Sequence, residues 1–179
     1  MKFFIGITPP QETRDQIIAF QRSFLNNLLP DKIEPHITVK AQAGLTEDTA
    51  WIGKVESVAK TCSRFSISFD GIGTFDDTVV FLKPVISQQL IDLHRKLVEA
   101  INPDAEELKN YFELDRYNPH LSLGGKGWGL QAEELSNLKN MAKTELANVP
   151  PFEVTFLRIY RQSLLDGPYE MFKDISFNH

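Results

Sequence analysis

The sequence has little cysteine and no long apolar runs. Cys62 is the only cysteine among 179 residues, so the chain can form neither an internal disulfide nor a thiolate metal cage, which fits a reducing compartment. Cys62 also lies on the apolar stripe of an expected helix, where a free cysteine behaves as a small buried hydrophobe. No stretch reaches 18 apolar residues, and the run from Phe3 to Ile7 is too short for a signal peptide. We therefore expect a cytoplasmic protein without a membrane partner.

Positive charge is also scarce. The chain has 19 Lys and Arg residues against 24 Asp and Glu residues, which gives a net charge of −5 at pH 7. This balance argues against a protein that coats long nucleic acid or a DNA duplex by neutralising phosphates, but it leaves a nucleotide or an RNA end as a partner.

A chain of this length buries roughly 70% of the surface that its unfolded form exposes. We expect one domain over residues 1–179, in a monomer without a cofactor.

Apolar periodicity predicts strands that alternate with helices. Strands are expected at 2–8, 33–40, 64–70, 78–84, 119–124, 152–163 and 169–177. Helices are expected to begin at Thr8, Thr46 and Ser87, whose hydroxyl groups suit an N-cap, and near residue 131. This order is neither a simple βαβ wind nor a helix bundle, and it predicts the α+β class.

Two connections between these elements have a distinctive composition. The segments Gly71-Ile72-Gly73 and Asp76-Asp77 are typical of turns. Residues 103–118 form a long acidic and aromatic connection, and connections of this length often have a function. Its aromatic residues, Tyr111, Phe112 and Tyr117, could stack on a nucleobase, although packing is their more ordinary role.

The strongest signal is a repeated pentapeptide. Pro35-His36-Ile37-Thr38-Val39 and Pro119-His120-Leu121-Ser122-Leu123 share the order proline, histidine, apolar, hydroxyl, apolar. In a strand, residues i and i+2 point to the same face, so His36 projects with Thr38 and His120 projects with Ser122. Because proline removes a ladder donor, each motif is expected at a strand start or edge, near the mouth of a cleft.

Two imidazoles and two hydroxyl groups suit in-line displacement at phosphorus. One histidine can take a proton from the attacking oxygen while the other gives a proton to the leaving oxygen, since the ordinary pKa near 6.5 allows either role. The hydroxyl groups can bind the non-bridging phosphoryl oxygens. Two other interpretations stay open: ordinary buried strands with hydrogen-bonded histidines, and a zinc site, for which a convincing third ligand is lacking. A further histidine, His94, lies on the flank of an apolar helix stripe and is expected to be structural.

With one H-x-[T/S]-apolar motif in each half of the chain, the sequence resembles the 2H phosphoesterase superfamily, which includes bacterial 2′-5′ RNA ligases and cyclic phosphodiesterases. The resemblance implies a bilobal α+β fold with pseudo-twofold symmetry, in which two antiparallel sheets line a central cleft and helices lie outside. It also implies metal-independent chemistry at 2′,3′-cyclic phosphate or 2′-5′ phosphodiester groups of nucleotides or RNA ends. By match to the motif, His36 and His120 would be catalytic, and Thr38 and Ser122 would bind the phosphate.

Four further residues are candidates for the same cleft. Lys40 shares the face of the first motif by the i+2 rule. Lys126 is the nearest basic residue after the second motif, where many relatives of the RNA-ligase branch carry arginine. Arg158 and Tyr160 alternate on one face of the strand expected at 152–163.

Two functions compete for this cleft. The first is a hydrolase or ligase-like enzyme of RNA processing that uses the paired histidines as general acid and base. The alternative is a binding module that holds a phosphorylated nucleotide or an RNA terminus without turning it over. Ligand-dependent thermal stabilisation without product formation would distinguish the second from the first.

Overall fold

The computed structural model describes residues 1–178. Its elements, in chain order, are β1 (Lys2–Ile7), α1 (Gln11–Arg22), α2 (Leu29–Lys32), β2 (Ile37–Lys40), α3 (Ile52–Lys60), β3 (Phe65–Ile67), β4 (Phe69–Phe75), β5 (Val79–Pro84), α4 (Gln88–Ile101), α5 (Ala105–Asn110), η1 (Leu114–Arg116), β6 (Leu121–Gly125), η2 (Lys126–Trp128), α6 (Ala132–Glu145), β7 (Phe152–Val154), β8 (Phe156–Gln162) and β9 (Tyr169–Ser176). The predicted α+β class is confirmed. The expected connection at 103–118 contains a short helix, α5, and a 3₁₀ turn, η1.

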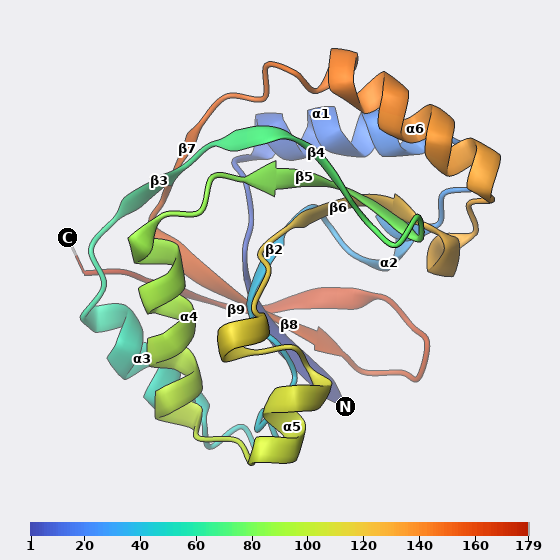
Figure 1. Ribbon diagram of the computed structural model, residues 1–179. Coiled ribbons are helices and arrows are strands. Elements are labelled where there is room, and N and C mark those ends of the chain that lie inside the picture. The colour runs from blue at the N-terminus through green and yellow to red at the C-terminus, as the bar shows by residue number, and fades with distance from the viewer. Residues whose placement is uncertain (179) are drawn as a thin grey trace.

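Both histidine motifs lead into edge strands of antiparallel sheets. One sheet has the strand order β2-β1-β8-β9, a second has the order β4-β5-β6, and β3 pairs with β7 in a short ladder. The edge strands β2 and β6 contact each other, so the two larger sheets meet along the strands that carry the motifs (Figure 1). The prediction that the proline before each histidine marks a strand edge is therefore confirmed.

Helices cover the outer sides of both sheets (Figure 1). Helix α1 follows β1 but packs against β6 of the other sheet, next to α6, which covers β4 and β5. Helix α4 follows β5 but packs against β2, with α3 beside it. The chain therefore crosses between the sheets in both halves, and apolar residues of both sheets share one cluster of buried side chains.

Side-chain caps explain where the two longest helices begin. The hydroxyl oxygen of Ser87 accepts a hydrogen bond from the Leu90 N–H at 3.2 Å, as expected for the start of α4. Gln131 and Glu134 form a capping box at the start of α6. Both helices have 14 residues.

Within residues 1–178, no helix combines the length and the apolar character needed to cross a membrane.

The prediction that Thr8 begins a helix is wrong. Helix α1 begins at Gln11, and Pro10 occupies the N-cap with an extended ψ of 156°. Two consecutive prolines explain the delay, because a residue that precedes proline avoids the helical region. The Thr8 hydroxyl instead donates a hydrogen bond to the Pro35 carbonyl at 3.1 Å, beside the first motif.

The prediction of a turn at Gly71-Ile72-Gly73 is also wrong. These residues belong to β4, whereas the turn predicted at Asp76-Asp77 is confirmed, and both residues have positive φ values of 41° and 51°. A Cβ atom on Gly73 would lie 2.4 Å from the ring of Phe81 on β5. The glycine therefore makes room for a neighbouring ring rather than for a turn.

Candidate active site

The backbone orients both histidine rings in the same way. The Nδ1 atom of His36 lies 2.9 Å from the carbonyl oxygen of Glu34, and that of His120 lies 2.8 Å from the carbonyl oxygen of Asn118. Because a carbonyl oxygen only accepts, each Nδ1 carries the proton and the neutral ring has an unprotonated Nε2. Within residues 1–178 neither Nε2 has a hydrogen-bond partner. Each ring therefore keeps one nitrogen free for a ligand.

Two aromatic rings from neighbouring strands enclose His36. Phe4 on β1 and Tyr160 on β8 lie with their ring centroids 4.8 and 5.4 Å from that of His36. A Cβ atom on Gly6 would lie 3.1 Å from the Tyr160 ring and 3.5 Å from the His36 ring, so the glycine gives both rings their space. A glycine inside a strand is the sequence signal that could have revealed this close approach.

A second pair of rings encloses His120 at the same distances. The centroids of Phe75 on β4 and Phe81 on β5 lie 4.8 and 5.4 Å from that of His120. Gly73 accommodates the Phe81 ring as described above. The two halves of the fold thus place an imidazole against two mutually packed rings, although the sequence around the four rings shows no repeat.

Burial keeps both imidazoles neutral. Desolvation lowers the pKa of His36 from 6.5 to about 4, the hydrogen bond to Glu34 opposes this shift, and the charge of His120 lowers the pKa further. Desolvation also lowers the pKa of His120, against the hydrogen bond to Asn118. The influence of one ring on the pKa of the other reflects their proximity across the two sheets.

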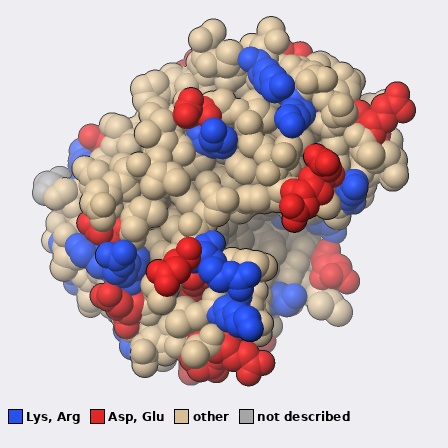
Figure 2. Space-filling view, in the orientation of Figure 1, with Lys and Arg blue, Asp and Glu red and all other residues tan. Residues whose placement is uncertain are grey.

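The rings open into two adjoining cavities. The first, of about 540 Å³, is lined by His36, Thr38, Gln42, Trp128 and Tyr169 among others. The second, of about 500 Å³, is lined by His120, Thr38, Phe75, Phe112 and Arg116 among others. Thr38, Ala41 and Tyr111 line both cavities, so the two form one cleft around the contact of β2 with β6. Figure 2 shows this face hollowed below its centre, with basic and acidic side chains around the hollow.

The two hydroxyl residues of the motifs occupy different places in this cleft. Thr38 lines both cavities, whereas Ser122, which is half-buried on β6, is absent from the lining of either cavity within the described residues. The Ser122 carbonyl accepts a hydrogen bond from Gln21 Nε2 at 3.1 Å. The structure therefore brings His36, Thr38 and His120 around one space and puts Ser122 beside it.

Comparison with known proteins shows which family the chain belongs to. The sequence matches the 2′-5′ RNA ligase superfamily over residues 9–135, a stretch that includes both motifs and more than half of the chain. The chain belongs to the 2′-5′ RNA ligase superfamily. The resemblance of its motifs to the 2H phosphoesterases is thereby confirmed. A comparison with curated proteins found no match.

Solved structures share the fold over nearly the whole chain of this superfamily member. TT0787 of Thermus thermophilus is 17% identical, with a TM-score of 0.67 over 99% of this chain and 98% of that one. E. coli LigT complexed with 3′-AMP is 20% identical, with a TM-score of 0.63 and the same coverage of 99% and 98%. E. coli LigT complexed with phosphate is 20% identical, with a TM-score of 0.61 and again 99% and 98% coverage. At this identity the likeness shows the fold.

Lys40 does not reach the cleft of this superfamily member. In the ladder of β1 with β2, Gly6 pairs with Thr38 and Ile5 pairs with Lys40, so β2 has one extra residue after Thr38. This β-bulge interrupts the alternation on which the i+2 rule depends. Lys40 turns into the protein, where it is 0% exposed and forms an ion pair with Glu113 at 2.7 Å.

The second motif strand has a bulge at the matching place. Val80 pairs with Gly124 and Phe81 pairs with Ser122, so one extra residue follows the hydroxyl residue on β6 too. Gly124 thus occupies the place of Lys40, and a Cβ atom there would lie 2.6 Å from the Leu130 side chain. In both halves the position after the bulge faces the interior, where Lys40 places its side chain and Gly124 leaves room for Leu130.

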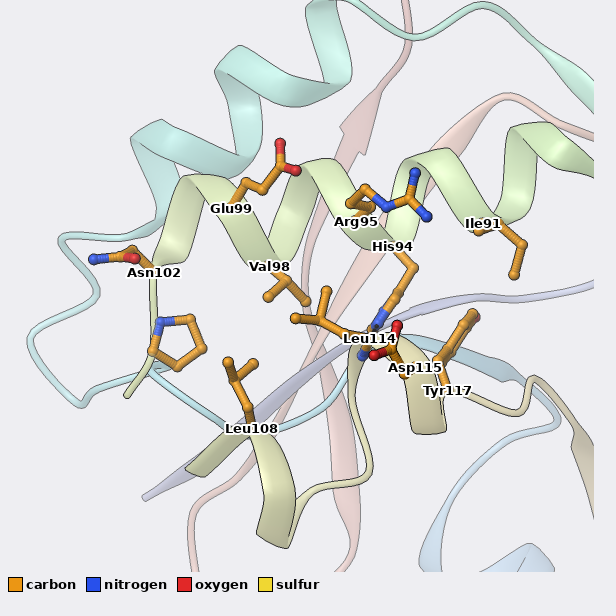
Figure 3. A pocket seen from close by; sticks show the side chains of 11 residues that line it. Ile91, His94, Arg95, Val98, Glu99, Asn102, Leu108, Leu114, Asp115 and Tyr117 are labelled. Carbon is orange, nitrogen blue, oxygen red and sulfur yellow. Dashed lines mark hydrogen bonds between the residues drawn. The ribbon is translucent and has the colours of Figure 1, made fainter. Parts of the chain in front are cut away.

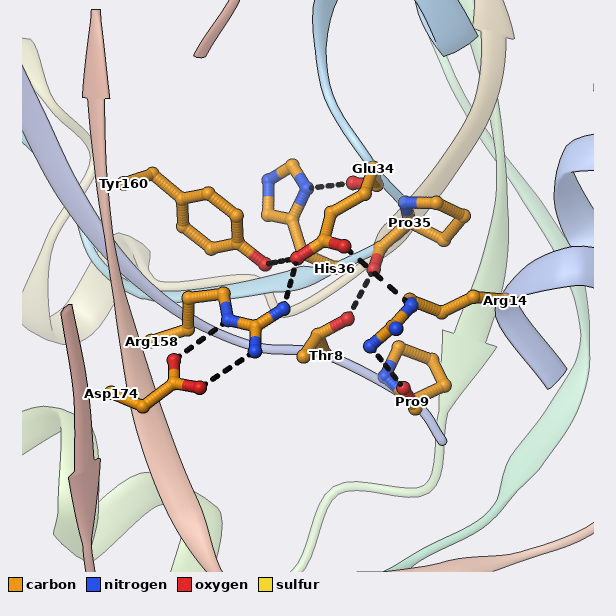
Figure 4. A network of polar contacts seen from close by, with 9 residues as sticks. All are labelled: Thr8, Pro9, Arg14, Glu34, Pro35, His36, Arg158, Tyr160 and Asp174. Carbon is orange, nitrogen blue, oxygen red and sulfur yellow. Dashed lines mark hydrogen bonds and ion pairs between the residues drawn. The ribbon is translucent and has the colours of Figure 1, made fainter. Parts of the chain in front are cut away.

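Arg158 and Tyr160 do not line the cleft; both bind Glu34, the residue that precedes the first motif. Figure 4 shows the carboxylate of Glu34 between them: it accepts hydrogen bonds from Arg158 Nη1 at 2.7 Å and from the Tyr160 hydroxyl at 2.8 Å. Arg158 also pairs with Asp174 at 2.7 Å, and Tyr160 is 1% exposed. Because the Glu34 carbonyl orients His36, the contacts to the Glu34 side chain also stabilise the position of the His36 ring.

The loop that follows the second motif forms part of the cleft wall. Gly127 and Trp128 line the first cavity, while the Lys126 side chain is exposed and its backbone N–H donates to the Thr78 carbonyl at 2.8 Å. Lys126 thus lies beside the cleft rather than within its lining. It remains a candidate for contact with a longer substrate.

His94 is structural, as expected from its place on α4. Its Nδ1 donates to the Val39 carbonyl at 2.8 Å, its Nε2 accepts from the Leu114 N–H at 2.9 Å, and its ring stacks on Tyr117 with centroids 3.8 Å apart. A third cavity of about 390 Å³ lies behind this stack, between α4 and residues 103–117 (Figure 3). Because both nitrogens of His94 are occupied, no proton transfer is expected from this ring.

Proposed function

We propose that this protein is a metal-independent phosphoesterase that acts on 2′,3′-cyclic phosphate or 2′-5′ phosphodiester groups of nucleotides or RNA ends. One observation carries the proposal. Two neutral imidazoles, each with Nδ1 bonded to a carbonyl and Nε2 free, open into adjoining cavities that share Thr38. Membership of the 2′-5′ RNA ligase superfamily supports phosphodiester chemistry at such a pair.

The reaction uses the two free nitrogens in opposite ways. Water or a ribose hydroxyl attacks phosphorus in line with the leaving ribose oxygen, and the Nε2 of one histidine takes the proton of the attacking oxygen. The other ring, protonated on Nε2, gives its proton to the ribose oxygen as the bond to phosphorus breaks. The Thr38 hydroxyl, which lines both cavities, donates a hydrogen bond to a non-bridging oxygen, whose charge grows in the transition state. The Ser122 hydroxyl, which lies beside the cleft, makes the second such contact if the bound phosphate extends to β6.

This scheme needs one protonated ring, whereas burial lowers the pKa of both His36 and His120 in the free protein. A bound phosphate anion acts against this shift, because a negative charge nearby favours the imidazolium form. Substrate binding thereby creates the acid. The alkaline limb of the pH profile, where the general acid loses its proton, should accordingly lie at lower pH for kcat/KM, which reports the free protein, than for kcat, which reports the complex.

The shape and charge of the cleft favour a short substrate. Cavities of about 540 and 500 Å³ suit a nucleotide or the end of an RNA chain. Charges of both signs surround the hollow, and the net charge of the chain is −5, which disfavours a long track of phosphates (Figure 2). Phosphate and 3′-AMP, with which E. coli LigT structures have been solved, are suitable probes.

The decisive experiment follows hydrolysis of a 2′,3′-cyclic mononucleotide in the presence of EDTA. We expect turnover by the wild-type protein and a loss of about 10³-fold in kcat for either His36→Ala or His120→Ala, since general acid and general base catalysis each contribute about 10²–10⁴-fold. Full activity in either variant, or a requirement for added divalent metal, would contradict the proposal. A rise in Tm with 3′-AMP but no product would instead identify a binding module.

A further inference from the structure

The segment 104–118 lines the cleft but contributes little to the core. Tyr111 lines both cavities, and residues from Phe112 to Asn118 supply much of the lining of the second. Neither α5 nor η1 contains a buried residue, and a cavity lies between the segment and α4 beside the place where Tyr117 stacks on His94. Apart from that stack, apolar packing does little to keep the segment in place, and its position depends on polar contacts as well.

An enclosed ion pair fastens the segment to β2. The carboxylate of Glu113 accepts hydrogen bonds from Lys40 Nζ at 2.7 and 3.0 Å and from the Ala41 N–H at 2.9 Å. Lys40 is 0% and Glu113 is 4% exposed, and Lys40 also donates to the carbonyls of Ala41 and Ala43. Burial lowers the pKa of Lys40 and raises that of Glu113, while each partner opposes the shift in the other.

Two hydrogen bonds continue this attachment along the segment. The Leu114 N–H donates to His94 Nε2 at 2.9 Å. The Tyr117 hydroxyl donates to the Thr38 carbonyl at 2.9 Å, so the segment contacts the first motif directly. One residue further on, the Asn118 carbonyl accepts the hydrogen bond that orients His120. Tyr117, which contacts β2, thus lies immediately before Asn118, whose carbonyl orients the His120 ring.

We propose that Glu113 and Lys40 are positioning residues that hold the segment 104–118 against β2 and thereby fix the orientation of His120 relative to His36. The catalytic part of this proposal rests on the proposed function, whereas the orientation of the ring does not. Loss of the Glu113 charge leaves the Lys40 ammonium buried without its partner, so the contact opens. The Asn118 carbonyl then loses its fixed place, and a displacement of about 1 Å in such a site can cost about 10²-fold in rate.

The test uses Glu113→Gln and reads the tautomers of the histidine rings from two-bond ¹H–¹⁵N spectra. We expect His120 to change from pure Nδ1–H to a mixture of tautomers, while His36, which has its own support at Glu34, keeps the Nδ1–H form. In the cyclic nucleotide assay kcat should fall by about 10–100-fold, with a smaller change in KM. The matched control is Glu56→Gln, which removes an exposed 2.7 Å ion pair to Lys173 and should leave the spectra and kcat unchanged.

Each outcome decides the proposal. An unchanged His120 spectrum in folded Glu113→Gln overturns it, even if Tm has fallen, because a merely structural ion pair would give that result. If Glu113→Gln does not fold, Tyr117→Phe decides instead: it removes only the hydroxyl contact to Thr38, and we expect a smaller change of the same kind at His120. If the wild type has no phosphoesterase activity, the proposed function fails, yet the spectra still test the positioning.

Discussion

The two halves of the cleft orient the same ring with different supports. Around His36, the carbonyl that accepts from Nδ1 belongs to Glu34, whose side chain is fixed by Arg158 and Tyr160. Around His120, the corresponding carbonyl belongs to the exposed Asn118, and its place depends on the preceding segment. The orientation of the imidazole and its enclosure by two aromatic rings are duplicated, whereas the contacts that hold the accepting carbonyl are not. The two halves therefore reach the same free Nε2 through different supports.

The likeness of the two halves would be contradicted most clearly if His36 and His120 contributed to catalysis independently. We expect the double variant His36→Ala/His120→Ala to be no slower than either single variant, at about 10³-fold below the wild-type kcat, because the acid and the base act in one transition state. The measurement is initial rates on a 2′,3′-cyclic mononucleotide. Losses that multiply in the double variant would show that the half-sites contribute separately.

Low pH should decrease the free energy of unfolding because of the buried His36 ring. Above pH 6.5 this ring is neutral in both the folded and the unfolded chain. As the pH falls from 6.5 towards 4, the unfolded chain binds a proton that the folded chain excludes, so the free energy of unfolding decreases. At about 1.4 kcal/mol per pH unit the loss is at most about 3 kcal/mol.

Urea unfolding between pH 4 and pH 7 measures this loss, and His36→Gln should show a shallower dependence on pH. NMR titration of the two rings sharpens the comparison, because the pKa of His36 should be about 4. A His36 ring that titrates near 6.5 would contradict the prediction.

The glycines under the two aromatic pairs should differ in sensitivity. Gly73→Ala puts a Cβ atom 2.4 Å from the Phe81 ring, whereas Gly6→Ala puts one 3.1 Å from the Tyr160 ring. We expect Gly73→Ala to lower the free energy of unfolding by about 1–3 kcal/mol and to displace the ring that packs on His120. Gly6→Ala should cost less. Thermal unfolding of both variants checks the order, and equal losses would show that the two enclosures tolerate crowding equally.

The smallest expected effect comes from making the first aromatic pair like the second. Tyr160→Phe removes the hydroxyl bond to Glu34, and the His120 side has only phenylalanines in the corresponding places. We expect a loss of about 1.5 kcal/mol in the free energy of unfolding, because the acceptor is charged but keeps Arg158. The kcat value should change by only a few-fold. A loss as large as that of His36→Ala would give the hydroxyl a direct part in the reaction.

Much of the fold was predictable because periodicity records which face of an element is buried. The apolar stripes of α1 and α4 and the strands at both motifs were expected from spacing alone. Helix α5 was not, since a helix without a buried face leaves no apolar pattern. The strand at Gly71–Gly73 was missed because Gly73 makes room for a ring on the next strand and Gly71 lies at a register shift with a φ of 75°, neither of which local sequence shows.

The two histidines and Thr38 of the candidate site were predictable, whereas its other polar residues and its surroundings were not. Alternation over three residues links His36 to Thr38 correctly, since no bulge lies between them. The same rule fails for Lys40, one bulge further on, because the extra residue is defined only by the pairing of β2 with β1. Arg158 and Tyr160 do share a face, as expected, but that face meets Glu34 rather than the cleft.

The sequence by itself determined the α+β class, the two motif strands with their edge positions, and the placement of His36 beside Thr38 on the first of them. These features depend on near neighbours along the chain, where steric rules and the strand period act. Only the tertiary structure decided which rings enclose the histidines, where Lys40 points and which segment orients His120. Those outcomes depend on strand register and on contacts between residues far apart in the chain, and no local pattern encodes them.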